Sequence, residues 1–286
     1  MSRPFTAGEF ALVRDRKKRR YLVRLADDGE FHTHAGVIKH AEIIGAGEGI
    51  EVRSSGNAAY TFVRPTLIDY VLQMKRGAQI IYPKDLGPIL ILADIAPGVR
   101  VLESGVGSGA LSIALLRGGA TVVGYEIRED FAKVADTNVR AFVGPELSDR
   151  YTIEVRDIYE GIDETDLDRV VLDLAEPWQV VPHAAKALHV GGIFLSYLPT
   201  INQTAHLCEV LAGSQFGLIE TIEILQRSWH IDGPSVRPDH RMVGHTGFLT
   251  VARLLAPSDE DGPAQETHVP KANFGTLGRI DDTPDT

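Results

Sequence analysis

Up to about residue 64, short apolar runs alternate with polar turns such as Asp27-Asp28-Gly29 and Ser55-Gly56-Asn57. This pattern is typical of short strands joined by tight turns. The predicted strands are Tyr21–Leu25, Gly36–Ile38, Gly49–Arg53 and Tyr60–Val63. We therefore expect a small β domain over residues 1–64. Pro65 suits the first turn of a helix, which predicts a linker helix over residues 65–76.

From Gly77 onward, apolar runs of strand length alternate with helical patterns. The predicted strands are Arg100–Glu103, Thr121–Tyr125, Tyr151–Val155, Arg169–Leu174, Gly192–Tyr197, Leu218–Gln226 and Phe248–Leu254. The predicted helices are Pro88–Ile95, Gly109–Arg117, Asp130–Phe142, Gln179–Ala187 and Ile201–Ala212. Such alternation indicates a doubly wound α/β fold over residues 77–256, with a mostly parallel seven-stranded sheet covered on both faces. Ligands of such sheets bind beyond the carboxyl ends of the strands.

Composition limits the class of protein. No apolar stretch approaches the roughly 18 residues that a membrane span needs, and charges stand where a signal peptide would be apolar. We expect a cytoplasmic protein with no membrane partner. Cys208 is the single cysteine of the 286 residues, which excludes intrachain disulfides and cysteine-rich zinc sites.

The net charge of −10 is unevenly distributed. Residues 257–286 hold seven acidic residues and two basic ones. Their net charge of −5 is half of the net charge of the chain, and they contain few apolar residues. We expect this acidic tail to be disordered. In contrast, residues 14–20 form a dense basic run. Such a run is commonly a solvated turn, but it could also bind phosphates.

A glycine-rich loop, Glu103 to Gly109, follows the first strand of the predicted sheet and precedes an apolar helix. Glycines let the backbone turn sharply and approach a ligand. The spacing Gly105-x-Gly107-x-x-Ala110 also fits a dinucleotide, so spacing alone leaves two cofactors open. A carboxylate at Glu103 suits the cationic amino-acid part of S-adenosylmethionine, whereas it would repel a pyrophosphate. The sequence therefore favours a methyl donor.

Three further carboxylates follow predicted strands. Glu126 ends the second strand and could bind a ribose with either cofactor. Asp157 follows the third, where it could accept a hydrogen bond from an adenine amine or cap a helix. Asp173 follows the apolar run Val170–Leu172, where an unpaired charge would be costly to bury, which makes it a candidate functional residue. A structural carboxylate remains the alternative for Asp173, and a core aromatic for Trp178.

A histidine cluster in the β domain raises the question of a metal. His32, His34 and His40 could include a His-x-His zinc pair. Because neither a cysteine nor a nearby acid pair completes such a site, we expect no metal.

The chain resembles the tRNA adenine-N1 methyltransferases that modify adenine 58 in the T loop, in their bacterial and archaeal form. The resemblance covers residues 5–257. It is carried by residues 31–36, 76–85, the glycine loop, 125–128, 173–178, 197–200, Gln203 and 237–248. Ser104 and Val106 depart slightly from the family's usual residues, and these small changes leave the glycines intact.

This resemblance implies a class I, Rossmann-like methyltransferase fold, S-adenosylmethionine as donor, tRNA as acceptor and a homotetramer. It implies that the cofactor is held by Gln79, Glu103, Gly105, Val106, Gly107, Ser108, Gly109, Ala110, Glu126, Asp157 and Asp173. Asp173 would accept a hydrogen bond from the adenine N6 amino group, orient N1 and afterwards take a proton. Tyr82 and Tyr197 are candidates to stack on the base. Arg237, His240 and Arg241 are candidate tRNA contacts.

Three other functions stay open at this stage. A nicotinamide-dependent oxidoreductase could use the same glycine loop. A catalytically inactive tRNA-binding subunit would not need the glycines together with Glu126 and Asp173, which are all present. A methyltransferase acting on a small molecule or a protein would leave the β domain and residues 237–248 unexplained.

Overall fold

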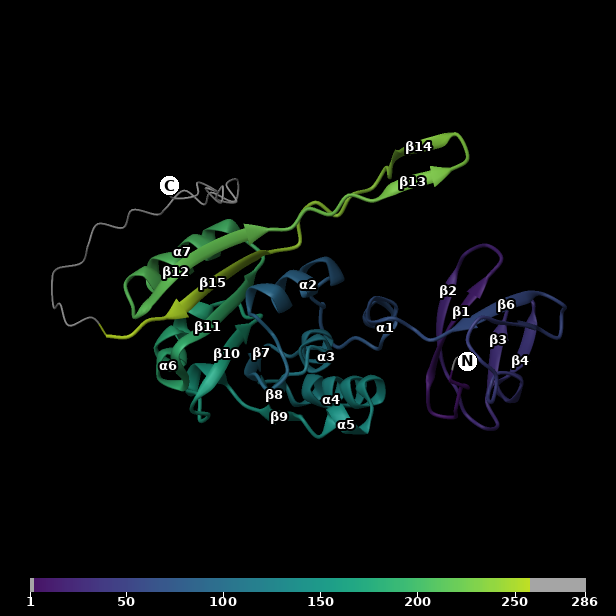
Figure 1. The fold of residues 1–286 in the computed structure, drawn as a ribbon, viewed down its shortest axis with the longest axis horizontal. Helices are drawn as coiled ribbons and strands as arrows, with labels where there is room; N and C mark the ends of the chain where they lie inside the picture. Colours follow the sequence, from purple (N-terminus) through teal and green to yellow (C-terminus); the bar gives the residue numbers. More distant parts are fainter. Residues whose placement is uncertain (1–2, 258–286) are drawn as a thin grey trace, which may run out of the picture.

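The computed structural model describes residues 3–257, and Figure 1 shows a small β-rich lobe beside a larger α/β lobe. The predicted acidic tail from residue 258 onward lies outside the described residues. In the small lobe, β1 (Phe10–Asp15), β2 (Arg20–Arg24), β5 (Ile50–Arg53) and β6 (Ala59–Val63) form an antiparallel sheet in the order β2-β1-β6-β5. β3 (Glu30–Thr33) and β4 (Gly36–Lys39) form a separate two-stranded hairpin in the same lobe. A separate core that includes Phe5, Tyr60 and Phe62 is buried inside this lobe.

The small lobe joins the large one through α1 (Leu67–Gln73). The helix begins at Leu67, so Pro65 lies before it and not in its first turn as predicted. Thr66 caps the helix: its side chain accepts a hydrogen bond from Asp69 N, and Asp69 accepts in return from Thr66 N. Tyr70 of α1 lies between the two lobes, with its ring 5.0 Å from Phe10 of β1 and 4.2 Å from Phe142 of the large lobe. Burial of these aromatic rings holds the lobes together.

The large lobe is built on a seven-stranded sheet in the order β12-β15-β11-β10-β7-β8-β9. Its strands are β7 (Arg100–Ser104), β8 (Thr121–Glu126), β9 (Tyr151–Val155), β10 (Leu167–Leu172), β11 (Leu188–Leu198), β12 (Phe216–Glu223) and β15 (Phe248–Leu254). β15 runs antiparallel to both of its neighbours, and the other pairings are parallel. The mostly parallel α/β fold with a separate N-terminal β domain is therefore confirmed.

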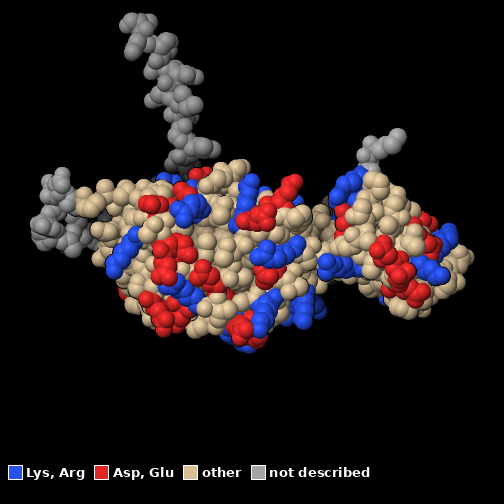
Figure 2. Space-filling view, turned by 90° about the horizontal axis from the view of Figure 1, so that it is seen from below, with Lys and Arg blue, Asp and Glu red and all other residues tan. Residues whose placement is uncertain are grey.

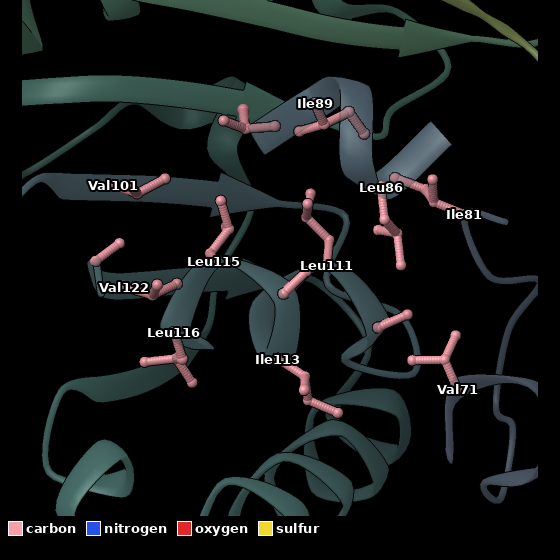
Figure 3. Close-up of a cluster of buried hydrophobic side chains, with 14 of the residues drawn as sticks. Val71, Ile81, Leu86, Ile89, Val101, Leu111, Ile113, Leu115, Leu116 and Val122 are labelled. Atoms are coloured by element: carbon pink, nitrogen blue, oxygen red, sulfur yellow. The ribbon is translucent and has the colours of Figure 1, made fainter. Parts of the chain in front are cut away.

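Helices cover both faces of this sheet, as alternating side chains require. Val101 and Val122 point to the face covered by α2 (Pro83–Leu92), α3 (Ala110–Arg117) and α4 (Glu129–Val143), which is followed by the short α5 (Pro145–Ser148). Figure 3 shows Leu111 and Leu115 of α3 in the centre of that core. Leu102 points to the other face, which α6 (Val181–Ala187) and α7 (Ile201–Ala212) cover. Short 3-10 turns lie at His40–Glu42, Ile158–Glu160 and Pro177–Val180.

Two parts of the large lobe differ from the sequence prediction. The first helix begins at Pro83, not at Pro88, because Pro83 occupies the first helical position that prolines favour and Pro88 lies inside the helix. Between β12 and β15 the chain forms a hairpin arm, β13 (Trp229–Asp232) and β14 (Ser235–Pro238), that projects away from the sheet (Figure 1). The pattern predicted no strands there.

Acidic and basic side chains are interspersed on the face of the molecule shown in Figure 2. Within residues 3–257, no helix is both long enough and apolar enough to cross a membrane.

Candidate functional site

The sheet order places four carboxylates side by side at one edge. β10, β7, β8 and β9 are consecutive neighbours in the sheet and run parallel, so their carboxyl ends meet at the same edge. Asp173, Glu103, Glu126 and Asp157 lie at or just after these ends, in that order across the sheet. β7 is also where the chain reverses its direction across the sheet, the position at which α/β folds bind ligands.

The glycine loop crosses this edge with a geometry that requires glycine. Gly105 has φ +82°, and a Cβ placed on it would lie 2.1 Å from the carbonyl oxygen of Asp173. Gly109 has φ +85°, and its Cβ would lie 2.9 Å from a methyl group of Val139 in α4. The first glycine therefore brings the loop directly against Asp173, and the last lets α3 begin against α4.

Glu103 is the most deeply buried acid of the edge, with 1% of its surface exposed. Its Oε2 accepts a hydrogen bond of 2.6 Å from the hydroxyl of Ser112 in α3. Its Oε1 is buried and has no hydrogen-bond partner among the described residues. Burial, reinforced by the charges of Asp173 and Glu126, raises the pKa of Glu103 to about 8, although Ser112 acts in the opposite direction. A buried, unpartnered carboxylate oxygen is the acceptor that a cationic group would satisfy.

Glu126 and Asp157 both accept hydrogen bonds from main-chain amides. Glu126 Oε2 accepts from Gly107 N at 2.9 Å, and Oε1 accepts from Arg128 N at 3.0 Å. Asp157 caps the turn that follows it by accepting from Tyr159 N at 2.9 Å. These bonds fix both carboxylates, and each carboxylate oxygen retains a lone pair for a further donor.

Ser108 of the glycine loop forms hydrogen bonds with the loop that precedes α2. Its hydroxyl accepts from Gly77 N at 3.1 Å and from Ala78 N at 3.2 Å, and donates to Ala78 O. This contact places Gln79 on the wall of a recess that Glu103 and Asp173 also line. The Ser108 hydroxyl is thus occupied by the protein itself, and Gln79 keeps an exposed side chain at the recess.

Asp173 lies at the opening of the same recess, partly exposed. Its amide donates to Ser104 O at 2.9 Å, which continues the β10–β7 pairing past the last strand residue. Desolvation raises the pKa of Asp173 to about 7. Gln203 of α7 donates to Ala175 O at 2.9 Å and holds the loop that follows. Trp178 packs against the second core.

The predicted substrate residues divide into two groups. Tyr197, at the end of β11, is buried, and burial raises its pKa to about 12. Because β10 and β11 pair in parallel with Leu172 opposite Ser196, the next residues along the two strands, Asp173 and Tyr197, lie beside each other. Tyr82 is the residue that precedes α2.

Arg237, His240 and Arg241 lie elsewhere, on β14 and on the segment that returns from the arm. None of the three lines the recess. Arg14, Arg16, Lys17 and Lys18 are exposed around the β1–β2 turn, whereas the other two members of the basic run form ion pairs, Arg19 with Asp15 and Arg20 with Asp69.

Sequence reasoning missed several residues that shape the site. Ser112 is the partner of Glu103, and Asn138 of α4 donates to Lys75 O and Ser108 O. Lys84 and Asp85 form a buried ion pair at the start of α2. A polar residue on the apolar face of a predicted helix, as at Ser112 and Asn138, is a signal that could have found two of them.

The histidines of the small lobe have other contacts. His40 is buried, and its Nδ1 accepts from Ala26 N at 3.0 Å. Over the part of the chain that the structure describes, no group of three or more His, Cys, Asp or Glu side chains could hold a metal ion.

Comparisons with known proteins show the family that the chain is similar to. Residues 60–236 match the family described as the GCD14 subunit of the tRNA methyltransferase complex, and residues 4–52 match a TrmI-like N-terminal domain. The tRNA (adenine(58)-N(1))-methyltransferase TrmI of Thermus thermophilus is 39% identical over 85% of this chain and 95% of its own length.

Two solved structures share the fold. The tRNA (m1A58) methyltransferase TrmI of Aquifex aeolicus superposes with a TM-score of 0.77 at 31% identity, over 89% of this chain and 100% of its own. A structure described as a SAM-dependent O-methyltransferase from Thermotoga maritima gives a TM-score of 0.83 at 36% identity, over 90% and 96%.

Proposed function

The chain belongs to the tRNA (adenine-58-N1)-methyltransferase family, and from the site described above we propose that it transfers a methyl group from S-adenosylmethionine to N1 of adenine 58 in the T loop of tRNA. One observation carries this proposal beyond family membership. The unpartnered Oε1 of buried Glu103 and the carboxylate of Asp173 line one recess, and the Gly105 backbone lies directly against Asp173. A cationic donor and a base could therefore meet there.

The residues at the sheet edge fit S-adenosylmethionine. When bound, it supplies an electrophilic methyl group on a positively charged sulfonium. Glu103 would accept hydrogen bonds from the cationic amino-acid part, Glu126 from the ribose hydroxyls and Asp157 from the adenine amine. The backbone of residues 105–110 would lie along the ligand, and Gln79 would close the recess from the other side. The same buried Glu103 opposes a pyrophosphate, which argues against a nicotinamide cofactor.

Asp173 would act on the acceptor base. Adenine N1 is a neutral nitrogen with its own lone pair, so the protein need not create a nucleophile and positioning dominates catalysis. The Asp173 carboxylate would accept a hydrogen bond from the N6 amino group, which orients N1 and stabilises the positive charge that develops on the ring. After transfer it could take a proton from N6, and its pKa of about 7 suits that exchange.

The remaining substrate contacts are proposed from chemistry and location. Tyr82 and Tyr197 would line the pocket of the flipped base, because a base inside folded tRNA must leave its stack to reach the donor. Arg14, Arg16, Lys17 and Lys18, together with Arg237, His240 and Arg241 of the arm, would contact phosphates.

We also propose that the enzyme acts in the cytoplasm as a homo-oligomer, most simply a tetramer. The arm supports an assembly because it exposes large apolar side chains, with Trp229 57%, Ile231 73% and Val236 59% exposed. Exposed apolar clusters of this kind mark protein interfaces. Light scattering coupled to size-exclusion chromatography measures the assembly directly.

The proposed function is tested by incubating the protein with unmodified tRNA and S-adenosylmethionine that carries a labelled methyl group. We expect label in tRNA from the wild-type protein and none from Asp173→Ala, while calorimetry shows nearly unchanged donor binding by the variant. Normal turnover by Asp173→Ala contradicts the role of Asp173. Label transferred to small hydroxyl compounds instead of tRNA would favour an O-methyltransferase.

A further inference from the structure

A buried ion pair lies at the start of α2, outside the row of acids at the sheet edge. Lys84 Nζ lies 2.8 Å from Asp85 Oδ1, and the two side chains are 4% and 0% exposed. Both residues belong to the first turn of α2. A pair so completely removed from water is costly to form unless every remaining donor and acceptor is satisfied, so its other contacts indicate what it does.

Those contacts go to both roots of the hairpin arm. Lys84 Nζ donates to the carbonyl of Ile224 at 2.7 Å, immediately after β12, where the chain leaves the sheet. Asp85 Oδ2 accepts at 2.6 Å from the hydroxyl of Thr246, two residues before β15, where the chain returns. One ion pair therefore fixes both ends of the arm to α2.

Thr246 belongs to the segment that lies next to Tyr197. β11 and β15 pair antiparallel, with Tyr197 opposite Leu249 and Leu198 opposite Phe248, so the residues just before β15 lie at the end of β11 that carries Tyr197. The Thr246 hydroxyl donates its single proton to Asp85 and so anchors this segment.

The backbone beside Thr246 confines the Tyr197 ring. A Cβ added to Gly247 would lie 2.5 Å from two carbons of the Tyr197 ring, so the main chain lies flat against it. The Tyr197 ring is thus confined by the main chain at Gly247. Gly247 directly follows Thr246, the residue that Asp85 anchors.

We propose that Asp85 and Thr246 are positioning residues for the acceptor base: by anchoring the backbone at residues 246–247, they fix the orientation of the Tyr197 ring beside Asp173. This inference rests on the proposed function, because it assumes that Tyr197 lines the base pocket. The ion pair would act on the transfer step and on tRNA use, and not on donor binding, because neither Lys84 nor Asp85 lines the donor recess.

Thr246→Val is the appropriate test, because it removes the hydroxyl while keeping the branched shape and leaving the ion pair in place. Asp85→Asn would instead leave Lys84 buried without its counter-charge, which destabilises the whole fold and hides any effect on positioning. Thr246→Ser keeps the hydroxyl and serves as the conservative rescue. Thr250→Val is the matched control, since Thr250 lies on β15, four residues after Thr246, is 1% exposed, and its hydroxyl bonds that of Thr221 at 2.9 Å.

The measurement is the single-turnover rate of tRNA methylation at saturating donor, with the donor Kd measured in parallel. We expect Thr246→Val to lower the rate at least about fivefold with the donor Kd within about twofold, because small misplacements of a reacting group are costly. Thr246→Ser should restore the rate, and Thr250→Val should keep it while lowering the melting temperature.

A double-mutant cycle with Tyr197→Leu, which removes the aromatic ring and keeps an apolar side chain, separates positioning from general destabilisation. If Thr246 acts through the Tyr197 ring, the double variant should be no slower than the slower single variant. An unchanged rate in Thr246→Val, or single effects that multiply in the double variant, overturns the inference. Failure of the wild-type protein to methylate tRNA would overturn the proposed function instead, so the two failures are distinguishable.

Discussion

Replacing Glu103 by glutamine tests whether this buried acid is kept for a cationic ligand at the expense of stability. Burial raises its folded-state pKa from 4.5 to about 8. Between these values the folded protein holds a proton that the unfolded chain has released, so the free energy of unfolding falls as the pH rises and levels off above about pH 8. The contribution of Glu103 to the free energy of unfolding is therefore largest below about pH 5 and is lost as the pH rises to about 8.

The magnitude follows from the size of the shift. Each pH unit in the window lowers the free energy of unfolding by about 1.4 kcal/mol, so the change from about pH 5 to about pH 8 is at most about 4 kcal/mol. Glutamine has no titrating group, and Ser112 can still donate to its amide oxygen. In Glu103→Gln this part of the pH dependence should disappear.

Urea unfolding of the ligand-free protein at several pH values measures this difference. Glu154→Gln is the matched control, because Glu154 is an exposed carboxylate on β9 of the same sheet. We expect the wild-type protein and the control to lose stability in parallel between about pH 5 and about pH 8, and Glu103→Gln to lose at least about 1 kcal/mol less.

Glu103→Gln should weaken donor binding, although it removes the loss of stability at high pH. A hydrogen bond to a charged group contributes about 1.5–3 kcal/mol, so Glu103→Gln should weaken S-adenosylmethionine binding by about 10- to 100-fold. Calorimetry in buffers of different ionisation enthalpy should also show proton release on binding near neutral pH, smaller in the variant. The same pH dependence of stability and the same donor Kd in both proteins would refute the reasoning.

Two further predictions concern the same edge. Because desolvation raises the pKa of Asp173 to about 7, the single-turnover rate of the wild-type protein should rise with pH through that value and then level off. Asp173→Asn should be slow at every pH. A wild-type rate that falls over this range contradicts the proposed role of Asp173. Gly105→Ala should destabilise the protein by about 2 kcal/mol and weaken donor binding at least tenfold, since its Cβ would meet Asp173 O at 2.1 Å. Gly98→Ala is its control, with φ +92° and open space around the Cβ, and equal losses in both would show that the contact does not matter.

The sequence predicted the row of acids well because strand ends can be located from local patterns. Glu103, Glu126 and Asp157 each follow an apolar run, and parallel strands bring such positions to one edge. Asp173 was found in the same way. The sequence also predicted a glycine loop that turns sharply next to a ligand, but the strict requirement at Gly105 comes from contact with Asp173 O, a residue 68 positions away, and needed the structure.

What the sequence did not predict depends on long-range contacts. The partner of Lys84, Ile224, lies 140 residues away, and that of Asp85, Thr246, lies 161 residues away, so no local pattern indicates the ion pair's contacts. The arm escaped prediction because β13 and β14 pair mainly with each other and bury little of their apolar surface. Alternation between a buried and an exposed face, which identifies strands in a sequence, is therefore absent there.

Nucleoside mapping of tRNA methylated by the purified protein tests the central claim most directly. Unmodified tRNA with adenine at position 58 and the same tRNA with guanine there are incubated with labelled S-adenosylmethionine, digested and analysed. We predict labelled N1-methyladenosine from the first tRNA, mapping to position 58, and none at that position from the second. Label in another nucleoside, or no label in tRNA at all, would contradict the account.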